Sequence, residues 1–292
     1  MNKVKILLNR QEAIGDVLMT TPILKQLFLD YNGNCEIDFF VKSTSKEVVE
    51  NNPYVNQIYT RLPSNDDLKN YDRYINLDLV YEKNPKVHAI DAYGLETFGH
   101  TDFDHSLEFY TTATDKLQAD LIANSVNTKY IVIHVRKWYG ESRNLSEVFW
   151  QKFVQHILTN SNLSIIQIGL VGEPVFFGND RIINKLGKLT ISELKEVIEN
   201  SQCYVGTDSG PAHIASSTKI PMVVLYTSVR QEYRQPLRHF NKFLGIAADI
   251  ECYGCQEHLP PCTPFICKRG DMECVNRFDP TLVAEKVIEM IS

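Results

Sequence analysis

Residues 203–213 have the sequence CYVGTDSGPAH, an apolar run followed by a short polar turn and then by small residues. This pattern predicts a buried strand, a tight turn and a short helix at residues 212–217. In an open α/β sheet, ligands bind outside the carboxyl ends of the strands, where such a turn lies. The N–H groups at the start of the helix would favour an anionic ligand there. A capped turn beside a packed His213 is the alternative interpretation.

The same alternation of strands and helices extends along the chain in both directions. It indicates parallel sheets with crossover helices. The expected strands are residues 4–8, 37–41, 55–59, 74–79, 130–135, 164–169, 203–206 and 222–226. The expected helices are residues 17–28, a short one at residues 46–50, residues 147–158, one opened by the capping box at residues 190–193, residues 212–217, and one that begins at residues 279–280. No elements are assigned within residues 81–128.

Length and composition favour two globular domains. The chain has 292 residues, of which 43% are hydrophobic, and it contains 14 Tyr, 14 Phe and 2 Trp. At roughly 100–200 residues per domain, we expect an N-terminal domain at residues 1–125 and a C-terminal domain at residues 126–292. The second is expected to carry a Cys-rich segment, residues 252–274, and a C-terminal helix. No apolar run approaches the roughly 20 residues of a membrane span, and the N-terminus resembles a first strand, so we expect a cytoplasmic protein.

The distribution of charge argues against a nucleic-acid partner. The net charge is −6, which is the wrong sign for a general nucleic-acid binder. Residues 1–125 contain 19 acidic and 12 basic side chains, whereas the remainder contains 17 acidic and 18 basic ones. A polyanionic ligand is therefore better suited to the C-terminal half. The acidic N-terminal half favours a weakly charged second substrate.

A second polar loop follows the first expected strand, between Arg10 and Asp16. Gly15 would allow close approach of the backbone to a ligand, and Asp16 lies near the start of a helix. Asp16 could equally serve only to cap that helix. The loop contains neither the G-x-G-x-x-G pattern of dinucleotide-binding proteins nor the lysine of a P-loop.

Together, the two loops resemble glycosyltransferase family 9, the ADP-heptose–lipopolysaccharide heptosyltransferases. Residues 10–22 are similar to the family's R-x-x-x-x-G-D-x-x-x-x-x-P run, and Asp208 to His213 are similar to its D-S/T-G-x-x-H signature. Cys274 followed by residues 278–280 resembles the family's C-terminal ending. The resemblance covers residues 1–60 and 130–292.

The resemblance implies a GT-B fold, with two Rossmann-like domains that face each other across a cleft. The acceptor is expected on the N-terminal domain and the nucleotide-sugar on the C-terminal one. It implies an inverting transfer with Asp16 as the general base and with Arg10 and Gly15 in the cleft loop. The expected substrates are ADP-heptose, or a similar nucleotide-sugar, and a glycan or lipid-linked acceptor such as lipopolysaccharide, whose use is compatible with peripheral contact with the inner membrane.

The resemblance also implies a donor-binding set. These residues are Arg143, Glu173, Asp208, Ser209, Gly210 and His213. Arg143 is expected to meet the donor phosphates, with Arg136 and Lys137 as alternatives, and Glu173 is expected to meet the ribose. Helix amides and one Arg can stabilise the departing diphosphate without a divalent ion, so no catalytic cofactor is expected.

Five cysteines are concentrated in one segment near the C-terminus. They are Cys252, Cys255, Cys262, Cys267 and Cys274. Only the first pair has a spacing common among metal ligands, so a structural zinc or iron and free buried thiols are both compatible with the pattern.

Three functional alternatives remain open at this point. They are a GT-B enzyme with another nucleotide-sugar donor (an epimerase included), a heptosyltransferase that acts on protein hydroxyls, and a catalytically silent sugar-binding subunit. The presence of both Asp16 and the segment Asp208 to His213 argues against the silent subunit.

Overall fold

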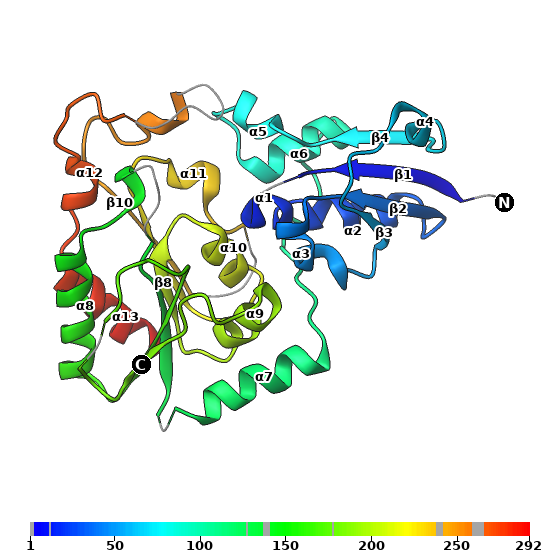
Figure 1. Ribbon diagram of the computed structural model, residues 1–292. Helices are drawn as coiled ribbons and strands as arrows, with labels where there is room; N and C mark the ends of the chain where they lie inside the picture. Colours follow the sequence, from blue (N-terminus) through cyan, green and yellow to red (C-terminus); the bar gives the residue numbers. More distant parts are fainter. Residues whose placement is uncertain are drawn as a thin grey trace. The chain divides into compact units, whose positions relative to one another are not determined.

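The computed structural model describes residues 3–11, 13–126, 128–136, 141–176, 178–237, 242–258 and 266–292 (Figure 1). The chain divides into two compact units, one comprising Met1–Thr112 and the other comprising Ala113–Pro236 and Phe240–Ser292. This division precedes the boundary expected near residue 125, because helix α7 (Ala113–Asn124) packs against α9 (Ile191–Glu199) of the second unit. Among the helices within these ranges, none combines the length and the apolar character that crossing a bilayer requires.

The first unit is built on a parallel sheet with the strand order β3-β2-β1-β4. Its strands are β1 (Val4–Asn9), β2 (Cys35–Phe40), β3 (Val55–Tyr59) and β4 (Arg73–Asn76). Its helices are α1 (Ile14–Leu18), α2 (Thr21–Asp30), α3 (Glu47–Glu50), α4 (Asn65–Leu68), α5 (Val80–Lys83) and α6 (Ala89–Phe98). The chain winds outward from β1 to β3 and then returns to place β4 on the other side of β1. The strand order therefore reverses between β1 and β4, where ligands bind in sheets of this kind.

The helix expected over residues 17–28 is divided in two. Pro22 is the second residue of α2, where its missing N–H group needs no partner, so α1 ends at Leu18 and the main helix begins at Thr21. This result agrees with the interpretation in which Pro22 starts the body of the helix.

The second unit contains a parallel sheet with the order β10-β9-β8-β5-β6-β7. Its strands are β5 (Tyr130–His134), β6 (Ser164–Ile168), β7 (Ile182–Asn184), β8 (Tyr204–Thr207), β9 (Met222–Tyr226) and β10 (Phe243–Ala247). Besides α7 and α9, its helices are α8 (Glu147–Asn160), α10 (Gly210–Ser216), α11 (Gln231–Arg234), α12 (Glu273–Asn276) and α13 (Pro280–Ile291). Short 3₁₀ turns lie at Ser43–Ser45 in the first unit and at Glu141–Arg143 and Cys255–His258 in the second unit. In this sheet the order reverses between β5 and β8.

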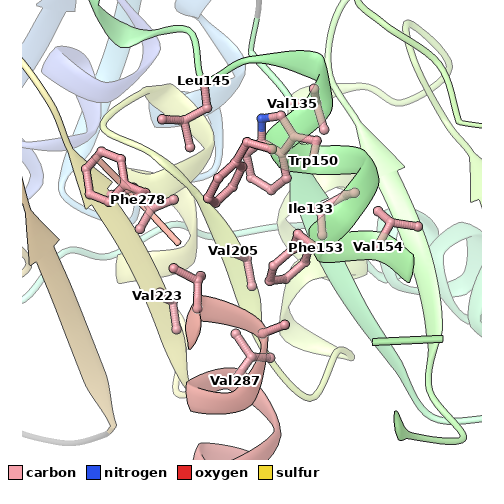
Figure 2. Close-up of a cluster of buried hydrophobic side chains, with 14 of the residues drawn as sticks. Ile133, Val135, Leu145, Trp150, Phe153, Val154, Val205, Val223, Phe278 and Val287 are labelled. Atoms are coloured by element: carbon pink, nitrogen blue, oxygen red, sulfur yellow. The ribbon is translucent and has the colours of Figure 1, made fainter. Parts of the chain in front are cut away.

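The larger sheet is covered on both faces. On one face Ile133, Val205 and Val223 of the strands pack with Trp150 of α8 and Val287 of α13 (Figure 2). On the other face the Tyr130 hydroxyl donates a hydrogen bond to the carbonyl of Val197 in α9 at 2.9 Å. Burial on both faces explains why these strands are almost continuously apolar rather than alternating. The capping box predicted for α9 is confirmed, because Thr190 and Glu193 exchange hydrogen bonds of 2.9 and 3.1 Å.

Candidate functional site

Each unit carries a cluster of charged side chains at the point where its strand order reverses. In the first unit the cluster comprises Arg10, Asp16, Tyr81, Glu82 and Tyr93, and we call it the Asp16 cluster. Arg10 follows β1, whereas Tyr81 and Glu82 lie on α5, just after β4. The parallel pairing of β1 with β4 brings these segments together although more than 60 residues separate them.

The carboxylate of Asp16 is held from three directions. Its Oδ2 accepts a hydrogen bond from the Arg10 guanidinium at 2.8 Å and one from the Ala13 N–H group at 3.2 Å. Its Oδ1 accepts a hydrogen bond from the Tyr81 hydroxyl at 2.8 Å. Asp16 is the third residue of α1, so the contact with Ala13 also satisfies a free N–H group at the start of that helix. The carboxylate is thus both a helix cap and a fixed, one-fifth exposed group.

Arg10 is the most deeply buried charge of this cluster. Its side chain is 2% exposed, and it donates to Asp16 and Glu82, each at 2.8 Å, and to the Leu77 carbonyl at 3.2 Å. Burial alone lowers the pKa of Arg10, but Tyr93, Asp16 and Glu82 raise it above its ordinary value. Arg10 is therefore a permanent positive charge fixed between two carboxylates.

The second unit brings most of the expected donor-binding residues together. We call this group the Asp208 cluster, and it comprises His134, Arg136, Arg143, Asp208, Ser209 and His213. Asp208 and Ser209 follow β8, His134 ends β5 and Arg136 follows it, so the cluster lies where β5 and β8 diverge. Gly210 begins α10, two residues before the helix start expected at Ala212.

Asp208 contacts two other side chains of the Asp208 cluster, Arg143 and His213. Its Oδ2 accepts a hydrogen bond from Arg143 at 2.8 Å, and its Oδ1 lies 3.6 Å from Nε2 of His213. Burial alone would raise the pKa of Asp208, but Arg143, His213 and Arg234 hold it well below its usual range. Asp208 therefore carries a negative charge whose partners in the cluster are cations, and it fixes the position of Arg143.

Arg136 and Arg143 place two positive charges beside one another. Arg136 donates to the Asp208 carbonyl at 2.6 Å, while burial and the neighbouring Arg143 lower the pKa of Arg136 to about 10. Because the two guanidiniums repel each other, a bound anion in contact with both would relieve that repulsion. The site is electrostatically suited to a phosphate or diphosphate.

Glu173 lies beside the cluster, after β6. Its Oε1 is 3.8 Å from Nε2 of His134, whose Nδ1 is 3.1 Å from the Ser209 hydroxyl. Its Oε2 is buried and has no hydrogen-bond partner among the described residues. A Cβ at Gly169 would lie 1.9 Å from that oxygen, and Gly169 has a φ of +145°, so the position requires glycine.

The cysteines expected to bind metal are only partly described. Cys252, Cys255, Cys267 and Cys274 carry free thiols, whereas Cys262 lies outside the described residues, as does Lys137. Burial and the three neighbouring thiols raise the pKa of Cys274 to about 12, so these sulfurs lie near one another. Within the described ranges no group of three or more His, Cys, Asp or Glu side chains is arranged to hold a metal ion.

Several residues of the two clusters, and one residue that contacts them, were not predicted from the sequence. Tyr81 and Glu82 belong to a stretch without a recognisable motif, and His134 is an ordinary strand residue by pattern. Gln256, which accepts a hydrogen bond from Arg143 at 3.1 Å, comes from the Cys-rich segment. The available signal was topological, since Tyr81 and Glu82 follow the expected strand 74–79 as Arg10 and Asp16 follow the expected strand 4–8.

Comparisons with known proteins agree with these features. The model of glycosyltransferase family 9 (heptosyltransferase) matches residues 178–263. Lipopolysaccharide heptosyltransferase 3 of Escherichia coli is 23% identical over an alignment of 284 positions. The alignment covers 76% of this chain and 82% of that protein.

Solved structures extend the similarity to the whole fold. E. coli ADP-heptose lipopolysaccharide heptosyltransferase II aligns with a TM-score of 0.74 at 14% identity, over 99% of this chain and 98% of that one. The iron-containing dodecameric glycosyltransferase TibC of enterotoxigenic E. coli aligns with a TM-score of 0.73 at 14% identity, over 99% of this chain and 78% of that one.

Two parallel α/β units and the similarity to solved structures define a fold of the GT-B class. The family model over residues 178–263 and the similar lipopolysaccharide heptosyltransferase 3 show that the chain is similar to glycosyltransferase family 9.

Proposed function

We propose that this protein is an inverting glycosyltransferase that transfers a heptose, or a related sugar, from ADP-heptose to a hydroxyl of lipopolysaccharide or another glycan. The observation that carries the proposal is the pair Arg136 and Arg143, held beside Asp208 at the start of α10. This arrangement supplies positive charge where a nucleotide diphosphate would leave. The names of the similar proteins supply the donor and the class of acceptor.

The reaction we propose is a direct displacement at the anomeric carbon of the donor sugar. The acceptor oxygen forms a bond to that carbon while the bond to the diphosphate oxygen breaks. Asp16 takes the proton of the acceptor hydroxyl, and Arg10, Tyr81 and the Ala13 N–H group keep its carboxylate in one orientation. The bonding pair leaves with the diphosphate, whose growing charge Arg143, Arg136 and the N-terminus of α10 stabilise.

For the nucleoside we propose Glu173 as the ribose ligand. A buried carboxylate oxygen that lacks a partner within the described part of the chain is costly, and a ribose hydroxyl would satisfy it. His134 contacts both Glu173 and Ser209, so it can couple the position of the ribose ligand to that of the turn before α10.

The donor is tested by a panel of ADP-, UDP- and GDP-linked sugars, each incubated with the protein and a lipopolysaccharide core acceptor in excess EDTA. We expect glycosylated product with ADP-heptose and a rate that EDTA leaves unchanged, because the cations of the site are arginines. Product from a UDP or GDP donor alone, or an isomerised donor without transfer, would assign the protein to a different GT-B activity. Activity lost in EDTA and restored only by Mg²⁺ or Mn²⁺ would contradict the proposed role of the arginines.

A structural metal bound by the cysteines of residues 252–274 is a separate hypothesis, and one of these cysteines, Cys262, lies outside the described residues. The thiols of Cys255 and Cys274 have raised pKa values and stay protonated at neutral pH unless a cation binds them. If a thiolate site forms, elemental analysis of protein purified without added metal is expected to find about one zinc or iron per chain. Folded, active protein that contains neither metal would identify the cysteines as packing residues.

A further inference from the structure

Two carboxylates share one buried arginine in the Asp16 cluster. The same nitrogen of Arg10, NH2, lies 2.8 Å from Oδ2 of Asp16 and 2.8 Å from Oε1 of Glu82. Arg10 also stacks near the rings of Tyr81 and Tyr93, at 5.4 and 5.9 Å from their centroids. Arg10 thus bonds to both carboxylates at once, and its charge is shared between them.

Glu82 makes a contact that the proposed transfer does not require. Its Oε1 bonds to Arg10, whereas its Oε2 is buried and lacks a hydrogen-bond partner among the described residues. An ionised oxygen without a partner is costly in a protein interior. The hydrogen bond from Arg10 to the Glu82 carboxylate is charge-assisted, and a neutral amide at this position would not reproduce it.

The charge of Glu82 has a direct consequence for Asp16. An arginine bonded to one carboxylate stabilises the ionised form of that carboxylate and makes it a poorer proton acceptor. A second carboxylate on the same arginine offsets this effect, because it neutralises part of the charge and adds a negative charge nearby. Glu82 therefore shares with Asp16 the charge of the arginine that orients the Asp16 carboxylate.

The remaining charged groups near Asp16 lie on elements that pack against α1. Asp78 accepts hydrogen bonds from Gln11, at the other side of the loop. The 3₁₀ turn at Ser43–Ser45 and helix α3 contact α1 and introduce Lys46, Glu47 and Glu50, of which Lys46 and Glu50 pair with each other. Tyr81 donates a hydrogen bond to Asp16.

We propose that Glu82 is a positioning residue for the transfer reaction, holding Arg10 and dividing its charge so that Asp16 can accept the proton of the acceptor hydroxyl. The proposal rests on the role of Asp16 given under Proposed function.

The test is the pH dependence of kcat and kcat/KM for wild type and Glu82→Gln, with Glu82→Asp as the charge-conserving variant and Glu96→Gln as an exposed control. In Glu82→Gln the whole charge of Arg10 acts on Asp16, so the acid limb of both profiles is expected to move to lower pH by about one to two units. Because a weaker base is a less effective one, the plateau of kcat should fall by up to about tenfold, while KM for the donor stays unchanged. Glu82→Asp should restore the midpoint of the acid limb.

If kcat falls by the same factor at every pH and the midpoint of the acid limb does not move, Glu82 has only a structural role. That result would overturn the proposal. If Glu82→Gln does not fold, Glu82→Ser, which carries a smaller neutral side chain, provides the same measurement. A midpoint displaced to lower pH is expected, and an unmoved midpoint would overturn the proposal. An active Asp16→Ala variant would instead refute the proposed base, so the two failures are distinguishable.

Discussion

Asp16→Ala is expected to lower the rate of glycosyl transfer by about 10²–10⁴-fold while leaving the affinity for ADP within a few-fold of wild type. The carboxylate contacts Arg10, Ala13 and Tyr81, all in the first unit, whereas we assign the diphosphate to residues of the second unit. Transfer is measured with ADP-heptose and a lipopolysaccharide acceptor, and ADP binding is measured by calorimetry.

Two further variants support the interpretation of that result. Asp16→Asn keeps the shape and the acceptor oxygen but cannot accept the proton, so we expect it to be as inactive as the alanine variant. Asp66→Ala removes an exposed carboxylate of the same unit and should have wild-type activity. If Asp16→Ala retains more than about a tenth of the wild-type rate, the general base lies elsewhere.

Asp208→Asn is expected to weaken both ADP binding and the fold. Removing one charge from a buried pair leaves the other uncompensated, and such changes cost about 3–5 kcal/mol of stability. Here the uncompensated charges are Arg143, which bonds to Asp208 at 2.8 Å, and His213 when protonated. Arg143 would also lose the hydrogen bond that fixes its orientation, so the affinity for ADP should fall.

The effect of Asp208→Asn on stability should depend on pH in a definite direction. The pKa of Asp208 is lowered on folding, so its contribution is complete above the pKa of an unfolded Asp, about 3.9, and is lost as the pH falls below it. The difference in the free energy of unfolding between wild type and variant should be full at pH 7 and shrink below about pH 4. Asp180→Asn, at an exposed site of the same unit, is the matched control. Equal stability and unchanged ADP affinity in Asp208→Asn would remove Asp208 from the donor site.

Both clusters could be located from the sequence because each begins at the end of a strongly apolar strand. The segments after β1 and β8 combine a buried run with Gly and Asp, which predicts a turn at the ligand-binding edge of a parallel sheet. The local pattern places Asp16 and the segment Asp208 to His213 at these strand ends, and their roles in catalysis and binding stay predictions. The capping box of α9 was likewise predictable, since its two hydrogen bonds join residues three positions apart.

The partners of these residues were not predictable, because they come from non-local pairings. Glu82 reaches Arg10 only because β4 returns to pair with β1, and α5, which carries it, has only four residues and therefore no periodicity to detect. Gln256 reaches Arg143 from 113 positions away. Strands β7 and β10 were missed because their residues are mostly half-buried and lack the continuous apolar pattern of the central strands.

The proposed reaction is a direct displacement in which Asp16 activates the acceptor hydroxyl. Its most direct test is the anomeric configuration of the new linkage, determined by NMR on the product that the wild-type protein forms from ADP-heptose. The account predicts a configuration inverted relative to the donor, because the acceptor oxygen enters opposite to the departing diphosphate. Retention of the donor configuration would exclude a single displacement from the opposite face and would contradict the proposed role of Asp16.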